Sequence, residues 1–406
     1  MTSEWLSVSP AQCLEIAVRI GERVSRDLRS RYLARGEIAK VSSKLFYNGL
    51  PGQLLYLLIL NVVVSDMPPI VLGVGEVLDL AQQYSIRDND TFPACFVGGY
   101  GWALSLAYMS ALTGSFASWP ALVALLDAMD AGVVANQKCD VMSGLAGCLL
   151  TLRVVDAVRP CGDTATKINA YLAILSKRAV REKQSCWWPS DIDSTRPLLG
   201  FAHGAAGIAA ALSLTTESSH KGEVSGLAHA LSGALAYERS CFDAQNFVWP
   251  DYRAGHVTAP MAASWCAGAV GIGFSRLLCL RNDDSRLALE DITRALRIAL
   301  QSRPRENFCL CHGRAGTVDF VAALGTAGLL APSQRVDVGI FLRTFIDDAS
   351  HLINTWLSDV RTPLGLMTGL AGIGYAMLRI THSEEVPSIL GFALPTRMPQ
   401  PPHSYH

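Results

Sequence analysis

The sequence predicts an all-α protein, a double α/α-barrel or toroid of seven inner and seven outer helices. Seven Gly-x-x-Gly steps recur roughly every 45 to 65 residues, and internal repeats of this period indicate a solenoid or a closed array. An apolar stretch follows each step, and amphipathic stretches lie between them. We infer closure into a ring from the number of repeats and from the contrast between fully buried and half-exposed helices. Periodicity alone would also allow an open solenoid. The steps are Gly49–Gly52, Gly98–Gly101, Gly144–Gly147, Gly204–Gly207, Gly268–Gly271, Gly313–Gly316 and Gly369–Gly372.

The inner helices are predicted directly after the steps. The residues that follow Gly147, Gly207 and Gly372 are apolar nearly all round a helix, which indicates helices buried on every side. Glycine suits these starting points because a helix that begins deep among its neighbours needs close backbone approach.

The outer helices are predicted from amphipathic patterning. In Leu287–Leu300 the residues Leu289, Ile292, Leu296 and Leu300 form one stripe, with the charged Glu290, Asp291, Arg294 and Arg297 mostly elsewhere. Ala121–Met129 and Phe341–Leu357 have a similar pattern. Ser9-Pro10 is a favourable cap for an N-terminal helix whose apolar residues are Cys13, Ile16, Ala17 and Ile20.

Three segments are expected along the chain. Residues 1–40 form an N-terminal helical segment, residues 41–382 form the α/α-barrel, and residues 383–406 form a Pro- and His-rich tail, loosely held from Pro387 on. His403 and His406 of the tail are weak metal-binding candidates. Helical patterning is weakest in Asp66–Phe92, and the sequence leaves open whether an extra peptide-recognition insertion lies there.

Composition excludes several classes of protein. Half of the residues are hydrophobic, 17% are charged and the net charge is −1, with none of the clustered Lys and Arg of a nucleic-acid groove. The most apolar run, Leu54–Val64, is shorter than the ~20 residues of a membrane span. The polar start lacks the pattern of a secretory signal, so the eleven cysteines are expected to be reduced, in the cytoplasm.

Two cysteines and a histidine share the phase of the repeat. Cys266 lies just ahead of the fifth step, and Cys311 and His312 lie just ahead of the sixth. Matching points of a repeat are expected to reach matching places in space, so Cys266, Cys311, His312 and His203 are expected to meet. The two cysteines and His312 predict a zinc site. Three protein donors leave one position of a tetrahedron open, as in catalytic zinc sites. Buried thiols with a hydrogen-bonded histidine are the alternative, and Cys309 is a candidate fourth ligand that would close the site.

His203 and Asp140 are the candidate catalytic groups. His203 holds the place of His312 in the fourth step but has no neighbouring cysteine, so a role in proton transfer is favoured over metal binding. Asp140 lies four residues before Gly144. The alternative for Asp140 is a helix cap or an exposed loop carboxylate. The alternative for His203 is a capping role.

Four of these motifs resemble the signature steps of the lanthionine synthetase C-like (LanC-like) cyclases, over roughly Leu45–Ile380. They are Asp140-Val-Met-Ser-Gly-Leu-Ala-Gly, Gly200-Phe-Ala-His-Gly-Ala-Ala-Gly, Ser264-Trp-Cys-Ala-Gly-Ala-Val-Gly and Cys311-His-Gly-Arg-Ala-Gly. The pair formed by Trp265-Cys266 and Cys311-His312-Gly313 is the most specific.

The resemblance implies a double α-barrel with one zinc held by Cys266, Cys311 and His312, with His203 as acid/base and Asp140 as a second active-site group. The implied reaction adds a peptide Cys thiol to dehydroalanine or dehydrobutyrine and gives thioether rings. The substrate would be a ribosomally made peptide, dehydrated by a separate dehydratase, with a transporter as a further partner. Trp265, Arg253, His256 and Arg314 are candidate substrate contacts, and a solvated loop is the alternative for Arg253 and His256.

The sequence departs from the family pattern at two positions. Ala267 stands where many relatives carry Tyr or His, and Ala262 where some carry Arg. Three alternatives stay open: addition of a free thiol such as glutathione, a non-catalytic peptide-binding scaffold with structural zinc, and an α/α-ring carbohydrate enzyme. The last wants paired carboxylates, for which Asp191 and Asp193 are the tempting pair.

Overall fold

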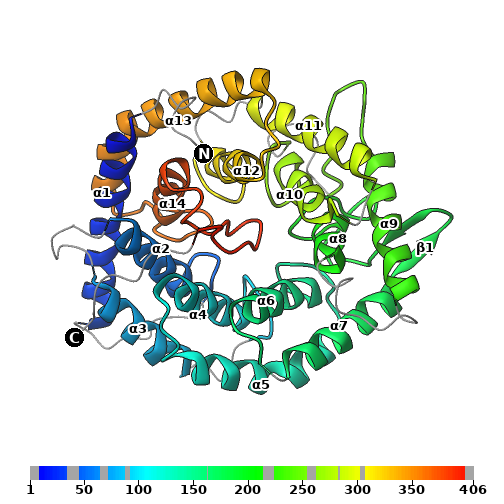
Figure 1. Cartoon of the computed structure of the whole chain (residues 1–406), viewed down its shortest axis with the longest axis horizontal. Coiled ribbons are helices and arrows are strands. Elements are labelled where there is room, and N and C mark those ends of the chain that lie inside the picture. The colour runs from blue at the N-terminus through cyan, green and yellow to red at the C-terminus, as the bar shows by residue number, and fades with distance from the viewer. Residues whose placement is uncertain are drawn as a thin grey trace. The chain divides into compact units, whose positions relative to one another are not determined.

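The computed structural model describes residues 9–33, 45–64, 72–86, 92–161, 163–213, 224–253, 262–281, 284–301 and 307–397. These residues form fourteen α-helices, a short π-helix and one two-stranded sheet (Figure 1). The chain separates into two compact units. The first comprises Met1–Thr91, Gly101–Asp127 and Asn307–His406, and the second comprises Phe92–Tyr100 and Ala128–Glu306.

In the first unit, α14 lies between α12 and α2 and also packs on α1, which in turn contacts α13 (Figure 1). The helices are α1 (Pro10–Leu28), the π-helix η1 (Arg29–Leu33), α2 (Leu50–Val63), α3 (Val74–Ile86), α4 (Tyr100–Thr113), the start of α5 (Trp119–Ala135), α12 (Arg314–Thr326), α13 (Pro332–Ser358) and α14 (Leu370–Thr381).

In the second unit, α8 lies between α6 and α10, while α7, α9 and α11 pack on these helices from one side. The elements are α6 (Leu145–Val158), α7 (Thr164–Arg178), β1 (Val180–Glu182), β2 (Ser185–Trp187), α8 (Ala205–Ser213), α9 (Val224–Ser240), α10 (Ala269–Cys279) and α11 (Ser285–Gln301). The two strands are antiparallel, with Val180 opposite Trp187.

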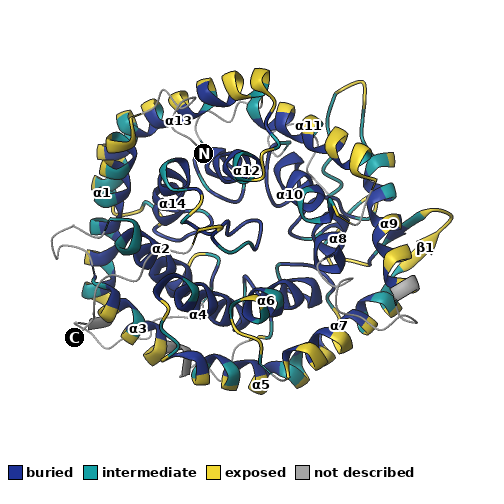
Figure 2. Ribbon diagram, in the orientation of Figure 1, coloured by how far each residue is buried: buried dark blue, intermediate teal, exposed yellow. Residues whose placement is uncertain are grey.

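Helices of two kinds alternate along the chain, as predicted. The even-numbered helices start at the Gly-x-x-Gly steps and are buried on nearly all sides; every residue of α8 is buried (Figure 2). The odd-numbered helices bury one face only, and α11 exposes a regular polar stripe. The predicted N-terminal helix is confirmed: Ser9 caps α1 by accepting the N–H of Gln12, and Cys13, Ile16, Ala17 and Ile20 are buried.

Two glycines show why the second position of the step excludes a side chain. A Cβ on Gly207 would lie 1.9 Å from the carbonyl oxygen of Phe201, and one on Gly271 would lie 1.9 Å from that of Trp265. Each glycine therefore lets the loop that precedes its helix fold back onto the first helical turn.

A buried ion network joins the helices of the second unit. Arg276 on α10 pairs with Glu238 on α9 at 3.0 Å and with Asp291 on α11 at 2.9 Å, and all three side chains are buried. The network corrects the predicted stripe of α11. Asp291 faces inward because it neutralises Arg276, whereas Leu289 is 40% exposed.

The expectation of a loosely held tail from Pro387 on is wrong for residues 387–393. Ile389 and Leu390 are fully buried. The carboxylate of Asp319 on α12 accepts hydrogen bonds from Ser388 Oγ and from the N–H of Leu390, and it also pairs with Arg379 at 2.8 Å. His403 and His406 lie outside the described residues.

Among the described residues, no helix is long and apolar enough to cross a bilayer.

Candidate metal centre and catalytic pair

The loops ahead of the buried helices are stacked in register by backbone hydrogen bonds. In the second unit, the N–H groups of Phe96, Met142 and Ala202 donate to the carbonyls of Met142, Ala202 and Cys266, at 3.2, 3.1 and 3.0 Å. Each of these residues stands two positions before the first glycine of its step. Residues at equivalent positions of successive Gly-x-x-Gly steps are therefore neighbours in space within this unit.

The first unit continues the same pattern. Cys311 donates its N–H to Met367 at 3.0 Å, and Met367 donates to Tyr47 at 2.8 Å. Cys266 and Cys311 thus occupy the same position of the loop, each at the start of a buried helix, α10 and α12. His203 and His312 occupy the next position, directly before the first glycine.

His203 and Asp140 form a hydrogen-bonded pair. Nδ1 of His203 lies 2.6 Å from Oδ2 of Asp140. The other carboxylate oxygen, Oδ1, accepts the backbone N–H of Ser143 at 2.7 Å and its hydroxyl at 3.1 Å. The Asp140 side chain is 9% exposed and that of His203 is 26% exposed. The carboxylate is thus fixed from one side and free to orient the imidazole on the other.

An ion pair lies beside this dyad. Nζ of Lys138 is 2.8 Å from Oδ2 of Asp191. The hydrogen bond raises the pKa of Lys138 and lowers the pKa of Asp191, and the charges of Asp140 and His203 add smaller effects of the same sign. The ion pair with Lys138 therefore favours the ionised form of Asp191. A glycosidase instead needs one carboxyl group that can hold a proton, so this pair does not suit a carbohydrate enzyme.

Cys266 and Trp265 are both buried in the loop before α10. Trp265 is fully buried, and its ring centroid is 5.2 Å from those of Phe96 and Phe201. Ser264 accepts the N–H of Ala267 at 3.2 Å and lies 3.7 Å from the sulfur of Cys266. Trp265 and Ser264 hold the loop from which the thiol projects.

Cys311, His312 and Cys309 share one tight turn before α12. Cys311 is 1% exposed, whereas His312 and Cys309 are half-buried. The sulfur of Cys309 accepts the backbone N–H of His312 at 3.3 Å and lies 3.4 Å from Nδ1 of the same residue. This contact was absent from the sequence reasoning, which considered Cys309 only as a ligand. The spacing of four before the glycine, shared with Asp140 and Ser264, is the signal that could have found it.

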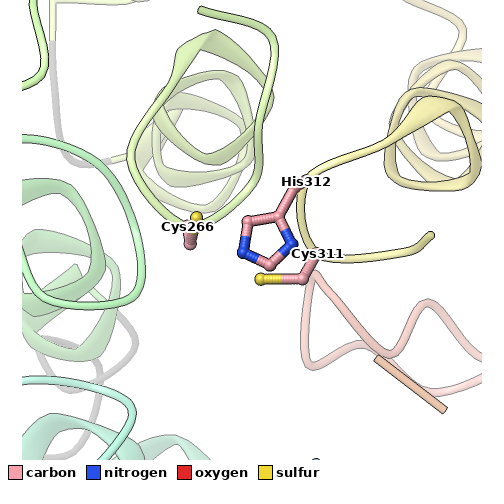
Figure 3. A group of neighbouring side chains, drawn as sticks. All are labelled: Cys266, Cys311 and His312. Atoms are coloured by element: carbon pink, nitrogen blue, oxygen red, sulfur yellow. The ribbon is translucent and has the colours of Figure 1, made fainter. Parts of the chain in front are cut away.

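Cys266, Cys311 and His312 form a group whose ligand atoms all lie within 4.8 Å of one another (Figure 3). Two thiols and an imidazole are donors that zinc prefers. Two Zn–S bonds of about 2.3 Å to one ion keep the sulfurs within about 4.6 Å of each other, a separation similar to that of the ligand atoms here. The residues present therefore fit a zinc ion. Neither Cys309 nor His203 belongs to the group.

The remaining sequence candidates lie in different surroundings. Arg314 is buried on α12, where it pairs with Asp348 of α13 at 2.5 Å and contacts the rings of Phe308 and Phe345. Arg253 forms an ion pair with Asp251, and an antiparallel β-bridge pairs its backbone with that of Ser194. His256 lies outside the described residues.

Comparison with known proteins identifies the family. The model of the lanthionine synthetase C-like proteins matches residues 41–391. The chain belongs to this family. No curated protein sequence matches it. The family model thus covers all seven steps, the two cysteines, His312 and the His203–Asp140 pair.

Solved structures extend the comparison to the fold. Nisin cyclase is similar with a TM-score of 0.65 and 14% identity, over 89% of this chain and 93% of that chain. This likeness, with the alternation of buried and half-exposed helices, confirms the predicted fold class, an all-α toroid. An α-1,6-mannanase variant of Salegentibacter sp. HEL1_6 (TM-score 0.48, 11% identity, 75% and 98% covered) and a polysaccharide lyase (TM-score 0.44, 11% identity, 87% and 100% covered) are more remote.

Proposed function

We propose that this LanC-like protein is a zinc-dependent lanthipeptide cyclase. It would catalyse intramolecular addition of peptide Cys thiols to dehydroalanine or dehydrobutyrine and so form lanthionine and methyllanthionine rings. The observation that carries the proposal is the donor set of Cys266, Cys311 and His312, whose ligand atoms lie within 4.8 Å of one another. Membership of the family and the fold shared with nisin cyclase support it.

The proposed ligands are the two thiolates and one ring nitrogen, with one zinc per chain. Three protein ligands leave one position for a fourth group, which suits catalysis rather than a closed structural site. A zinc ion held there would lower the pKa of a substrate thiol and keep it as the nucleophilic thiolate at neutral pH.

The His203–Asp140 pair supplies the proton chemistry in this proposal. Because Nδ1 of His203 is held by Asp140, Nε2 is the nitrogen that can accept the substrate thiol proton. Sulfur then bonds to the β-carbon, the C=C π pair moves into an enolate, and the same Nε2 returns a proton to the α-carbon. No atom is lost, and the Asp140 carboxylate stabilises the intermediate imidazolium.

The proposed partners follow from the substrate. The peptide must arrive with its Ser and Thr already dehydrated, so a separate dehydratase would act first, and a transporter could export the product. We place this chemistry in the cytoplasm, where the substrate thiols and the ligand cysteines stay reduced.

The test uses a synthetic peptide that contains one dehydroalanine and one cysteine. Ring closure leaves the mass unchanged and removes the thiol that N-ethylmaleimide would alkylate. The wild-type chain with one equivalent of zinc should protect the peptide from alkylation. The Cys266→Ala/Cys311→Ala double variant should lose both zinc and protection. Cys241→Ser, a half-buried cysteine after α9, is the matched control and should keep both.

Two results would overturn the proposal. One equivalent of zinc retained by the double variant would remove the metal site. A product that gains the mass of glutathione, when glutathione is added, would assign addition of free thiols instead of cyclisation.

A further inference from the structure

The geometry points to Cys309 as a positioning residue for His312: its sulfur holds Nδ1 of the ring, so that Nε2 is the nitrogen presented to the metal. This inference rests on the proposed function, because it assumes that His312 is a zinc ligand. It assigns to Cys309 a role outside the ligand set.

Cys309 occupies a loop position with a recurring structural task. In three repeats, the side chain four residues before the first glycine accepts the backbone N–H of the residue directly before that glycine. Asp140 accepts from Ser143 at 2.7 Å, Ser264 from Ala267 at 3.2 Å, and Cys309 from His312 at 3.3 Å. A sulfur here replaces a carboxylate and a hydroxyl as the acceptor that closes the turn.

Cys309 differs from its equivalent Ser264 because the residue that it caps has an imidazole. Its sulfur lies 3.4 Å from Nδ1, within the range of a weak hydrogen bond to sulfur. The same atom thus meets two nitrogens of His312, one of the backbone and one of the ring, which fixes the rotamer as well as the turn.

The consequence concerns the tautomer of His312. A histidine ligand usually donates its second ring N–H to a neighbouring acceptor, which fixes the tautomer and the ring direction. With Nδ1–H directed at the Cys309 sulfur, Nε2 keeps the lone pair that a metal needs. Asp140 does the same for His203, the residue at the matching position, at 2.6 Å.

The experiment compares Cys309→Ala and Cys309→Ser with the wild-type full-length chain. Zinc affinity is measured by competition with a chromophoric chelator, and cobalt substitution reports the thiolate ligands through the sulfur-to-cobalt charge-transfer band. We expect Cys309→Ala to bind one zinc about 10- to 100-fold more weakly, with an unchanged charge-transfer intensity. Cys309→Ser should restore most of the affinity, because a hydroxyl closes the equivalent turn at Ser264.

Thermal unfolding of the metal-free variants separates positioning from folding. Comparable melting temperatures of wild type and Cys309→Ala, with weaker zinc binding, support the inference. Wild-type affinity in Cys309→Ala, a weaker charge-transfer band, or a serine variant as impaired as the alanine variant would each overturn it. Absence of zinc from the wild-type chain would instead refute the proposed function itself.

Discussion

Nδ1 of His203 lies 2.6 Å from Oδ2 of Asp140, although the two residues are 63 positions apart in the sequence. Each comes from the loop before a different buried helix, α8 and α6. The hydrogen bond from Met142 to Ala202 holds these loops side by side. The register of the repeat therefore brings an imidazole and a carboxylate from two separate repeats into a hydrogen bond.

Replacing His203 by alanine should slow cyclisation while zinc stays bound. General acid/base catalysis by a positioned side chain contributes about 10²- to 10⁴-fold, so we expect a loss of that size in the rate of thiol protection. Zinc content is the internal control, measured on the same sample. A variant that cyclises at the wild-type rate would exclude His203 from proton transfer.

Asp140→Asn should also slow the reaction, because an amide can donate to Nδ1 and so favour the wrong tautomer of His203. Ser143→Ala is the matched variant: it removes the hydroxyl bond of 3.1 Å but keeps the backbone bond of 2.7 Å. We expect a clearly smaller loss for Ser143→Ala. Equal rates for the two variants would contradict an orienting role of the carboxylate.

Glu238→Ala should destabilise the protein strongly. Oε1 of Glu238 accepts the N–H groups of Gly200 and Ala206 at 3.1 Å each, and Oε2 pairs with the buried Arg276. Removing one partner of a buried ion pair costs about 3–5 kcal/mol. The free energy of unfolding in urea measures it. Glu290→Ala on the exposed face of α11 should change it by less than about 1 kcal/mol, and a similar loss there would argue against the buried network.

Gly207→Ala should be destabilising, by about 1–3 kcal/mol or more, because its Cβ would lie 1.9 Å from the carbonyl oxygen of Phe201. The control is Gly226→Ala near the start of α9, where the nearest atom, Ser176 Oγ, is 3.8 Å from the added Cβ. That variant should be neutral or more stable by up to about 1 kcal/mol. Thermal melts compare the two, and tolerance of Gly207→Ala would refute the close-approach role of the step.

The Lys138–Asp191 pair predicts a pH-dependent difference between wild type and Lys138→Gln. The lowered pKa of Asp191 makes its contribution present above the usual carboxyl pKa and lost as the pH falls through the folded-state value. The raised pKa of Lys138 makes its contribution disappear only at strongly alkaline pH. Because both side chains are well exposed, the difference in unfolding free energy at neutral pH should be about 1 kcal/mol at most.

Urea titrations at neutral and acidic pH check this prediction, and added salt should reduce the neutral-pH difference. A difference that grows on acidification would have the wrong sign for a carboxylate whose pKa the lysine lowers.

Much of the predicted fold and site followed from the positions of residues relative to the Gly-x-x-Gly steps. These positions indicated the buried helices, and they assigned Cys266 and Cys311 to one loop position and His203 and His312 to the next, because the backbone follows the same path in each repeat. Amphipathic patterning located α11 but misplaced Leu289 and Asp291. Hydrophobicity cannot show that a buried aspartate has an arginine partner on another helix.

The sequence by itself determined the order of the helices, the points at which the buried helices start and the residue types that lie at those points. Only the tertiary structure decided where side chains point. It directs the sulfur of Cys309 at the ring of His312, buries Arg314 against α13 and folds residues 387–393 onto Asp319. The reason is physical: spacing along the chain sets the position of a backbone, whereas the direction of a side chain depends on neighbours that are distant in the sequence.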